Sequence, residues 1–344
     1  MKNLVGTLLS TAPLIHPVAT PGGLLKRAKY CFRGLALARY TREWLAVLEA
    51  PEMAFIVKHH PCLFHKLQRP YLLRTLNILQ RLESLKQHYK FVVRHFSAAL
   101  IEEVYAPAGK LLVELPLEKT SALAVRLCFS KMEKEGDFTI CLEIKKTQKR
   151  IATLSFSIWR CEGTDREILI GGLQGDKGIN EDLVVAVTRG MFGLRPKAFL
   201  FYILQLFCGC WGIGRVRAVS DDMHIYRHFQ CRRNVRASYD KFWVECGGAP
   251  ASDGTFELPA AFVARDISTV RVNKRQQYRH RYAMLDKIRE QLLHGMVGAL
   301  QNEACPAVRG PVRACIGIRD ESSESSSAVP VLAKAKARQA IFPT

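Results

Sequence analysis

The spacing of hydrophobic residues changes once along the chain, after Ala108. Before this point apolar side chains recur at helical intervals, with basic residues between them in residues 24–50 and one broad leucine-rich stripe in residues 71–89. Prolines separate these segments. We therefore expect an N-terminal helical region, in which residues 24–50 form an amphipathic, basic helix or helix pair and residues 71–89 a further helix.

Apolar and polar residues alternate in the next part of the chain. Strict alternation is typical of antiparallel strands with one buried face. Five runs show it: residues 113–117, 123–127, 138–144, 152–158 and 167–173. The fifth run enters the glycine-rich sequence GGLQG, which we interpret as a turn whose backbone N–H groups can hold an anionic ligand.

Helical spacing returns in residues 180–190 and 198–213, and residues 216–220 resume as a β-branched strand. A strand, helices and a second strand in this order predict a β–α–β crossover. Beyond it we expect a strand at 239–245, a glycine turn and a closing strand at 256–258. Residues 271–294 predict a last, strongly basic helix.

These elements predict an α+β protein with an N-terminal helical region, a central, mostly antiparallel sheet with a β–α–β crossover, and a C-terminal basic helix. We divide the chain into an N-terminal segment (1–23), a helical region (24–100), an α+β domain (101–294) and a tail (295–344). The Ser/Glu-rich and Ala/Lys-rich composition of the tail predicts disorder.

The chain carries 51 basic and 31 acidic residues, a net charge of +20. Such an excess favours an anionic partner. An anionic membrane surface, an acidic envelope component, nucleic acid and a phosphate-bearing cofactor all fit the charge, as does solubility alone. Nucleic acid would stack on Tyr278 and Tyr282, but the chain has no nucleic-acid-binding motif, so we do not expect this partner.

The eleven cysteines include no CxxC pair, and the histidines lack ligands at regular spacing, so we expect no metal site. Free thiols indicate a reducing compartment, most simply the cytoplasm. The N-terminus resembles a secretion signal only weakly, because Pro13 interrupts its apolar run. The longest apolar run, residues 198–213, is shorter than the roughly 20 residues of a membrane span. We expect a cytoplasmic protein, with peripheral attachment to the inner membrane as the alternative.

Short phrases carry a resemblance to a known family, and they occur in a fixed order. They are HHP (59–61), HY (88–89), LQG (173–175), GLRPK (193–197), AVS..MHIYR (218–227), YDKFW.E.GG (239–248), G.FELP (254–259) and KRQQYRHRY..LD (274–286). Together they resemble the VirK/YbjX family of bacterial proteins, which carry a domain of unknown function. The resemblance implies a link to virulence, the cell envelope and antimicrobial-peptide resistance, without an agreed reaction.

The predicted order of elements is also similar to the core of GNAT acyltransferases, in which the turn after the strand holds the pyrophosphate of acyl-CoA. This resemblance implies an acyl- or aminoacyl-transferase with an acyl-CoA-type donor. The residues that would bind phosphate or add positive charge are Gln174, Gly175, Lys177, Gly178, Arg195 and Lys197. The turn departs from the usual Gln/Arg-x-x-Gly-x-Gly/Ala pattern, since Gly178 comes one position late and Asp176 is acidic. A modified or lost cofactor site is the alternative, and for GLRPK the alternative is a plain helix start.

Candidate catalytic residues follow the crossover, where α/β sheets commonly place ligand contacts. His224 is the candidate general base and Tyr226 the candidate general acid. Asp240 and Glu245 are further candidates, because neighbouring aromatic residues can raise a carboxyl pKa. The alternative is structural: a histidine or tyrosine packed in a loop, and carboxylates that cap a turn or pair with arginines.

Two classes of function are therefore open. One is an acyltransferase, and the other is a non-enzymatic envelope or virulence accessory protein that binds an anionic membrane or a partner protein through the basic helices at 24–50 and 271–294. No Gly-x-Ser-x-Gly, Walker or His-Glu-x-x-His motif is present, so hydrolase, NTPase and zinc-protease functions have no support.

Overall fold

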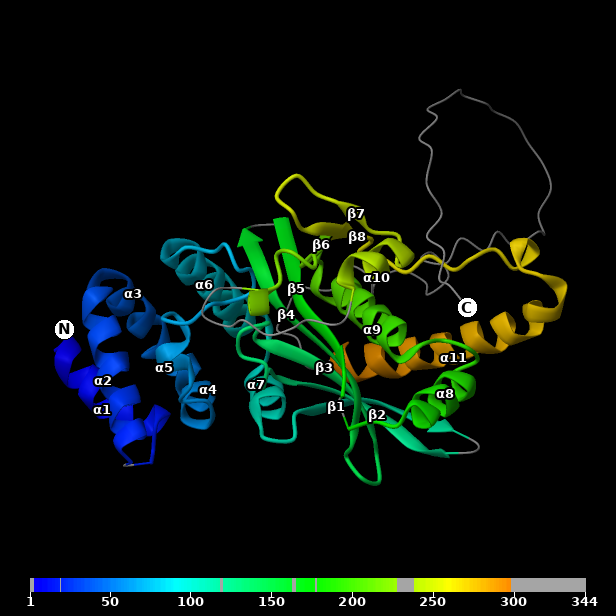
Figure 1. The fold of residues 1–344 in the computed structure, drawn as a ribbon. Coiled ribbons are helices and arrows are strands. Elements are labelled where there is room, and N and C mark those ends of the chain that lie inside the picture. Colours follow the sequence, from blue (N-terminus) through cyan, green and yellow to red (C-terminus); the bar gives the residue numbers. More distant parts are fainter. Residues whose placement is uncertain are drawn as a thin grey trace.

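Three parts of the molecule lie side by side: a group of N-terminal helices, a curved sheet and a long C-terminal helix (Figure 1). The structure is a computed structural model, and it describes residues 3–18, 20–117, 120–162, 165–176, 178–227 and 238–297. The combination of helices with a mostly antiparallel sheet confirms the predicted α+β class. The predicted disordered tail lies outside the described residues from position 298 onward.

The helical region precedes the sheet. Its elements are α1 (Leu4–Ile15), α2 (Pro21–Ala36), α3 (Ala38–Leu48), η1 (Pro51–Met53), α4 (Ala54–His59), α5 (Leu63–Lys66), α6 (Ile78–His95) and α7 (Ala98–Tyr105). Helices α2 and α3 are the helix pair predicted within residues 24–50. Helix α1 packs on them, because Leu8 and Ala12 form a small buried cluster with Tyr30 of α2 and Leu45 of α3.

The helix predicted for residues 71–89 begins later, at Ile78, so the predicted start was wrong. Asn77 and Gln80 form a capping box there, in which each side chain accepts a hydrogen bond from the other residue's backbone N–H. Before the cap, Leu72 adopts a φ of 55° and its N–H donates to the carbonyl of Lys134. The leucines of this segment, Leu72, Leu73 and Leu76, are buried in the main hydrophobic core, and this burial explains the apolar pattern.

All strands of the described chain belong to one sheet with the order β1-β2-β3-β4-β5-β6-β8-β7. The strands are β1 (Lys110–Leu117), β2 (Thr120–Phe129), β3 (Phe138–Ile144), β4 (Arg150–Glu162), β5 (Asp165–Gly175), β6 (Arg215–Ala218), β7 (Ala249–Pro250) and β8 (Phe256–Leu258). Neighbours are antiparallel except β5 and β6, which pair in parallel. The predicted meander and crossover are thus confirmed.

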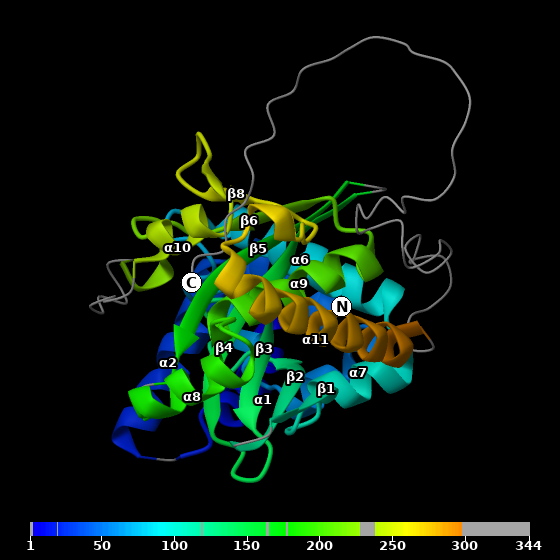
Figure 2. The same ribbon diagram turned by 90° about the vertical axis from the view of Figure 1, so that its right-hand side faces the viewer.

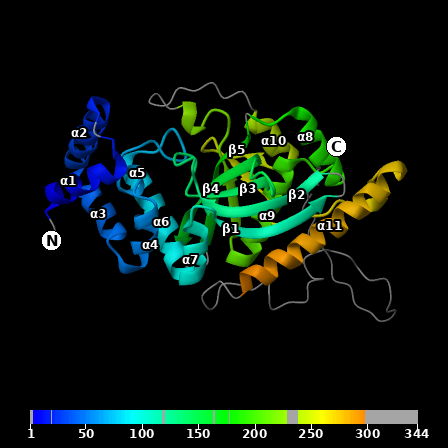
Figure 3. The same cartoon turned by 90° about the horizontal axis from the view of Figure 1, so that it is seen from below.

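Helices α8 (Glu181–Gly190) and α9 (Pro196–Trp211) make the crossover. Helix α9 is buried along most of its length, and the ring of Trp211 at its end lies 5.7 Å from Phe91 and 5.5 Å from Phe96. Helix α11 (Val272–Val297) crosses the β1 side of the sheet (Figures 2 and 3). Short 3-10 turns at Ile225–Arg227 and Ile267–Thr269 complete the described elements.

The stretch 239–245, predicted as a strand, is helix α10 (Tyr239–Glu245). The Ser238 side chain caps it by accepting from the N–H of Lys241. The predicted strand was therefore wrong, although Tyr239 and Trp243, which lie one helical turn apart, are both buried on one side. The sequence YDKFWVE fits an i, i+4 spacing as well as an alternating one.

The glycine-rich sequence after the fifth strand is not a turn. Strand β5 continues through it to Gly175, paired with β4.

No helix in the described ranges is both long and apolar enough to cross a membrane.

Candidate functional site

The loop from Ser130 to Asp137 joins β2 to β3. Its side chains contact the helical region and strands β4 and β5. Its sequence, SKMEKEGD, places acidic residues at 133, 135 and 137. The loop closes on itself, because the N–H of Ser130 donates to the carbonyl of Asp137 (2.8 Å). Asp137 and Glu133 contact the helical region, and Glu135 contacts strand β5.

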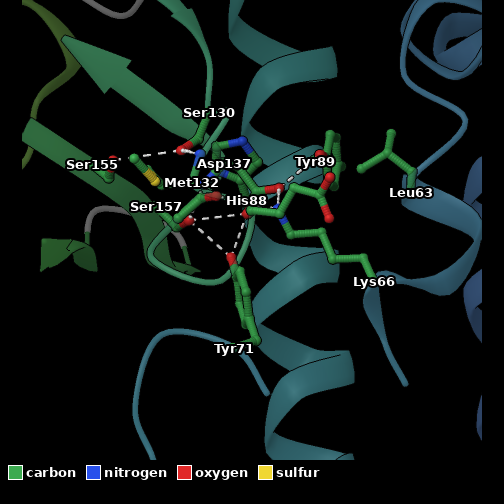
Figure 4. A network of polar contacts seen from close by, with 12 residues as sticks. Leu63, Lys66, Tyr71, His88, Tyr89, Ser130, Met132, Asp137, Ser155 and Ser157 are labelled. Atoms are coloured by element: carbon green, nitrogen blue, oxygen red, sulfur yellow. Dashed lines mark hydrogen bonds and ion pairs between the residues drawn. The ribbon is translucent and has the colours of Figure 1, made fainter. Parts of the chain in front are cut away.

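Asp137 forms the buried centre of the first contact (Figure 4). Lys66 of α5 lies 2.7 Å from Oδ1, and Tyr89 of α6 donates to the same oxygen (2.8 Å). Tyr71 and Ser157 both donate to Oδ2. Four donors from separate elements therefore converge on one carboxylate with no solvent exposure.

The charges of this cluster determine its protonation. Burial alone would raise the pKa of Asp137, but Lys66 and the hydrogen bonds outweigh it and hold the pKa well below its usual range. Burial, with Asp137 adding to it, raises the pKa values of Tyr71 and Tyr89 well above normal. Both tyrosines therefore act as donors to an ionised carboxylate. Since the cluster is closed to solvent, we interpret it as a structural clamp.

Glu135 makes the second contact, on strand β5. A Cβ on Gly171 would lie 2.1 Å from the carbonyl oxygen of Glu135, and one on Gly172 would lie 2.1 Å from its Oε2. Gln174 donates to Oε1, and His224 Nε2 lies 3.7 Å from the same oxygen. The glycines of GGLQG therefore allow this loop to approach the strand, which is a different role from the predicted phosphate cradle.

His224 and Gln174, predicted as catalytic and cofactor-binding residues, thus meet at one carboxylate. His224 is buried, its Nδ1 accepts from the N–H of Tyr226 (3.3 Å), and its ring stacks on Tyr239. Burial lowers the pKa of His224 to about 4, so the ring is neutral at pH 7. Tyr226 is half-buried, with its ring 5.4 Å from that of His224.

Strands β5 and β6 separate beyond the pair formed by Ile170 and Ala218. Ligands commonly bind where strands of an α/β sheet diverge. Here helix α10 fills the opening: the hydroxyl of Tyr239 accepts from the N–H of Leu173 (3.4 Å), and Trp243 donates to the carbonyl of Val219 (2.8 Å). Side chains of α10 therefore occupy the opening beside β5, the strand that carries Gln174 and Gly175.

The other predicted catalytic carboxylates have structural partners. Asp240 accepts from the N–H of Asp221 (2.7 Å) and so fixes the loop after β6. Glu245 pairs with Arg195, with an Nη2–Oε2 distance of 2.6 Å. These are the capping and ion-pair contacts named as alternatives, and Arg195 supplies the partner of Glu245.

The predicted phosphate-binding residues are spread over two elements. Gln174 and Gly175 lie at the end of β5, and in the following turn the N–H of Gly178 donates to Asp176 Oδ1 (3.1 Å). Lys177 lies outside the described residues. Arg195 is the N-cap residue of α9, and half-buried Lys197 has its pKa lowered by burial and by Arg195. GLRPK is thus a helix start, with Pro196 in the first turn.

Glu133 makes the third contact, with the helical region. Its Oε2 lies 3.0 Å from Arg69 Nη1 and 3.6 Å from His65 Nε2. Burial alone would raise the pKa of Glu133, but the interactions with His65, Lys66 and Arg69 outweigh it and lower the pKa to about 2. Arg69 and His65 are thereby held in place beneath α2.

A basic cavity opens between α2 and residues 65–69, at and just after the end of α5. Its volume is about 350 Å³. The charged and titratable side chains that line it are Lys26, Lys29, Arg33, Arg69, His16 and His65. Within the described ranges no group of three or more His, Cys, Asp or Glu side chains could hold a metal ion.

Exposed apolar side chains gather on the same helices. Eight of the fourteen large exposed hydrophobic residues in the described chain precede position 36: Val5, Leu9, Leu14, Val18, Leu24, Leu25, Phe32 and Leu35. The most exposed of them is Phe32, at 73%. The first acidic residue of the whole sequence is Glu43, so the segment that carries these apolar side chains contains basic residues but no acidic ones.

The sequence prediction missed the carboxylates of the 130–137 loop and the basic cavity. The alternation of Glu133, Glu135 and Asp137 directly before an apolar strand was a usable signal, because buried strands seldom begin next to uncompensated charges. The cavity had no local signal, because its residues come from separate helices.

The fold and these contacts define an α+β protein whose helical end is basic and partly apolar on its surface, and whose helices are clamped to the sheet through one acidic loop. The chain belongs to the DUF535 family of proteins of unknown function, whose model matches residues 22–294. It is 31% identical over 272 residues to the uncharacterized protein YbjX of Escherichia coli K12, covering 77% of this chain and 82% of that protein. The predicted VirK/YbjX membership is confirmed.

An uncharacterized protein of Haemophilus influenzae is 23% identical over 211 residues, covering 61% of this chain and 69% of that protein. Two solved structures of a cAMP-binding acyltransferase from Mycobacterium smegmatis, each of a different point mutant, also match. Both are 10% identical to this chain with a TM-score of 0.27, and the first covers 62% of each chain and the second 63%. This likeness is too distant to inform the function.

Proposed function

We propose that this protein binds an anionic membrane surface through its N-terminal helices α1 and α2. The observation that carries the proposal is the face of α2, which exposes Leu24, Leu25, Phe32 and Leu35 while no acidic residue precedes Glu43. Helices that lie in a membrane interface combine an apolar face with flanking Lys and Arg residues in this way.

Helix α2 is anchored to the protein by its opposite side. Tyr30 and Gly34 are its buried residues, and the Tyr30 hydroxyl lies 2.9 Å from that of Thr11 in α1. The residues at 25, 28, 32 and 35 follow an i, i+3, i+7, i+10 spacing, so they share one outward stripe. The helix therefore presents this stripe to a surface without unfolding.

Charge complementarity favours lipid as the occupant of this face. Helix α2 carries Lys26, Arg27, Lys29 and Arg33 and no acidic residue. Each basic side chain near an anionic leaflet contributes about 1 kcal/mol, and a buried Phe or Leu side chain adds roughly 1.5–3 kcal/mol. Together these contributions are sufficient for reversible peripheral binding.

The second basic helix, α11, does not fit this role as well. It lies at the far end of the molecule from α2 (Figure 1), and among its described residues only Val272 is a large exposed hydrophobic residue. Arg281 of α11 is buried and donates to the carbonyl of Phe192. The proposal therefore assigns membrane contact to the N-terminal helices.

Sedimentation with vesicles tests the proposal. The full chain should pellet with phosphatidylglycerol vesicles at low ionic strength and stay in solution with phosphatidylcholine vesicles, because the basic residues need an anionic surface. Added salt should weaken the binding by screening. Absence of binding to anionic vesicles at low salt would contradict the proposal.

Acyl transfer is the second candidate function. One observation favours it: His224 and Gln174 meet at Glu135 close to the point where β5 and β6 diverge. Tyr239 and Trp243 fill that opening, so an acyl-CoA donor would enter only if α10 moved away. A donor at a hundred times its Kd should stabilise the fold by about 2.7 kcal/mol. No thermal shift with acetyl-CoA or other acyl-CoA donors would count against this function.

A further inference from the structure

We infer that the basic cavity between α2 and α5 binds the phosphate group of a small phosphomonoester. Lys26, Lys29 and Arg33 reach it from α2, spaced i, i+3 and i+7 on one flank of the helix. Arg69 and His65 reach it from the opposite side. Four cations thus converge from two segments on one concave surface.

The floor of the cavity is held rigidly. Arg69 Nη1 lies 3.0 Å from Glu133 and 2.8 Å from His65 Nε2, so both side chains are fixed from behind by the 130–137 loop. Gln68 donates to the carbonyl of Tyr30 (3.2 Å) and ties the floor to α2. A site whose cationic groups are already positioned binds an anion at a smaller entropic cost.

His65 has a ring nitrogen that the protein itself does not use. Nε2 lies 2.8 Å from Arg69 Nη1, whereas Nδ1 is buried with no hydrogen-bond partner among the described residues. The residue is 9% exposed and its ring stacks on that of His16 at 5.8 Å. A buried polar nitrogen without a partner costs stability unless a ligand forms a hydrogen bond with it.

The charge of the cavity favours a dianion. Glu133 faces Arg69 and His65, but no described carboxylate forms an ion pair with Lys26, Lys29 or Arg33. A phosphomonoester carries up to two negative charges and three acceptor oxygens, so it can satisfy lysine and arginine donors from both sides at once. A carboxylate offers one charge and two oxygens and leaves more of these cations unmatched.

The volume of the cavity indicates a ligand larger than a free phosphate ion. A cavity of about 350 Å³ lies at the lower end of the range of small-molecule sites, so the phosphate would carry a small organic group such as glycerol. That group can belong to a soluble metabolite or to the headgroup of a lipid such as phosphatidic acid. This inference does not depend on membrane binding by the apolar stripe of α2.

Calorimetric titration of the full chain with glycerol 3-phosphate and inorganic phosphate tests the inference. The double variant Lys29→Gln/Arg33→Gln should weaken the affinity by at least about tenfold, because two charge-assisted contacts are lost. The matched control Arg39→Gln/Arg42→Gln removes the same charge from exposed positions of α3 outside the cavity and should retain the affinity.

A second arm separates the two sources of phosphate. Phosphatidylcholine vesicles with phosphatidic acid offer the monoester on a lipid, and phosphatidylglycerol vesicles offer only a diester. Binding to the soluble probe assigns a free phosphomonoester. At an ionic strength at which the phosphatidylglycerol vesicles no longer bind, binding to phosphatidic acid vesicles without binding to the soluble probe, lost in the Lys29/Arg33 variant and kept in the control, assigns the lipid headgroup. Binding to neither probe, or equal loss in both double variants, would overturn the inference.

Discussion

Lys66 Nζ and Asp137 Oδ1 form an ion pair of 2.7 Å in which the lysine side chain is 2% exposed and the aspartate side chain 0%. Lys66 belongs to the helical region and Asp137 to the loop that enters β3, so this pair joins parts of the chain that are 71 positions apart. Lys66 also donates to the carbonyl of Gly136 (3.2 Å). The contact fixes how the helices sit on the sheet.

Replacing Lys66 should therefore destabilise the protein strongly. In Lys66→Met the Asp137 carboxylate loses its counter-ion while it stays buried, and breaking such a pair costs about 3–5 kcal/mol. The control Lys145→Met removes an exposed pair with Glu114 (2.6 Å), and its effect should stay within about 1 kcal/mol. Urea unfolding measures both values.

The double variant Lys66→Met/Asp137→Asn distinguishes charge from packing. Because the unpaired charge is gone, it should be more stable than Lys66→Met alone. If the double variant were equally unstable or less stable, the buried charge would not be the cause of the loss.

His88 should make the free energy of unfolding depend on pH. Its side chain is buried, Nδ1 accepts from the N–H of Ile158 (3.2 Å), and burial lowers the pKa of His88 from 6.5 to about 4. The unfolded chain takes up the proton first as pH falls. The free energy of unfolding should thus fall by about 3 kcal/mol through His88 as pH is lowered from 6.5 to about 4. His88 should have no effect on it above pH 6.5.

Unfolding at several pH values tests this dependence with His88→Asn, since an asparagine oxygen can accept from Ile158. The slope of stability against pH should be smaller in this variant than in the wild type. Exposed His59 serves as the control, and His59→Asn should leave the slope unchanged. An identical slope in all three proteins would show that His88 does not titrate in this window.

Gly171 should not tolerate a side chain. A Cβ there meets the carbonyl oxygen of Glu135 at 2.1 Å, and a backbone atom cannot rotate away, so Gly171→Ala should cost about 3 kcal/mol, the upper end for overpacked sites. The control Gly209→Ala lies in α9 with nothing within 4 Å and should stabilise by about 0.5–1 kcal/mol. Thermal unfolding of the two variants should shift in opposite directions.

The periodicity of the sequence predicted the sheet and the crossover well, because strict alternation and long apolar runs are local signals. It failed at 239–245, where the spacing of Tyr239 and Trp243 fits both a strand and a helix. It also failed at 71–77, where buried leucines outside a helix happen to have helical spacing. Such cases are decided by tertiary contacts and capping.

The predicted site could be located only in part. His224 and Gln174 do meet, but they meet at Glu135, whose position depends on a loop that contacts β5 across Gly171 and Gly172. Contacts between distant segments leave no periodic signal. For the same reason the sequence showed a basic helix at 24–50 without the cavity beneath it.

The central claim is that the stripe on α2 inserts into an anionic membrane. Phe32→Ser removes an aromatic side chain that is 73% exposed, and Val272→Ser removes a 77% exposed apolar side chain on α11 as the control. Neither change should alter folding. Sedimentation with phosphatidylglycerol vesicles at low ionic strength should show binding weakened by about tenfold or more in Phe32→Ser and unchanged in Val272→Ser. Equal binding by both variants and the wild type would contradict the claim.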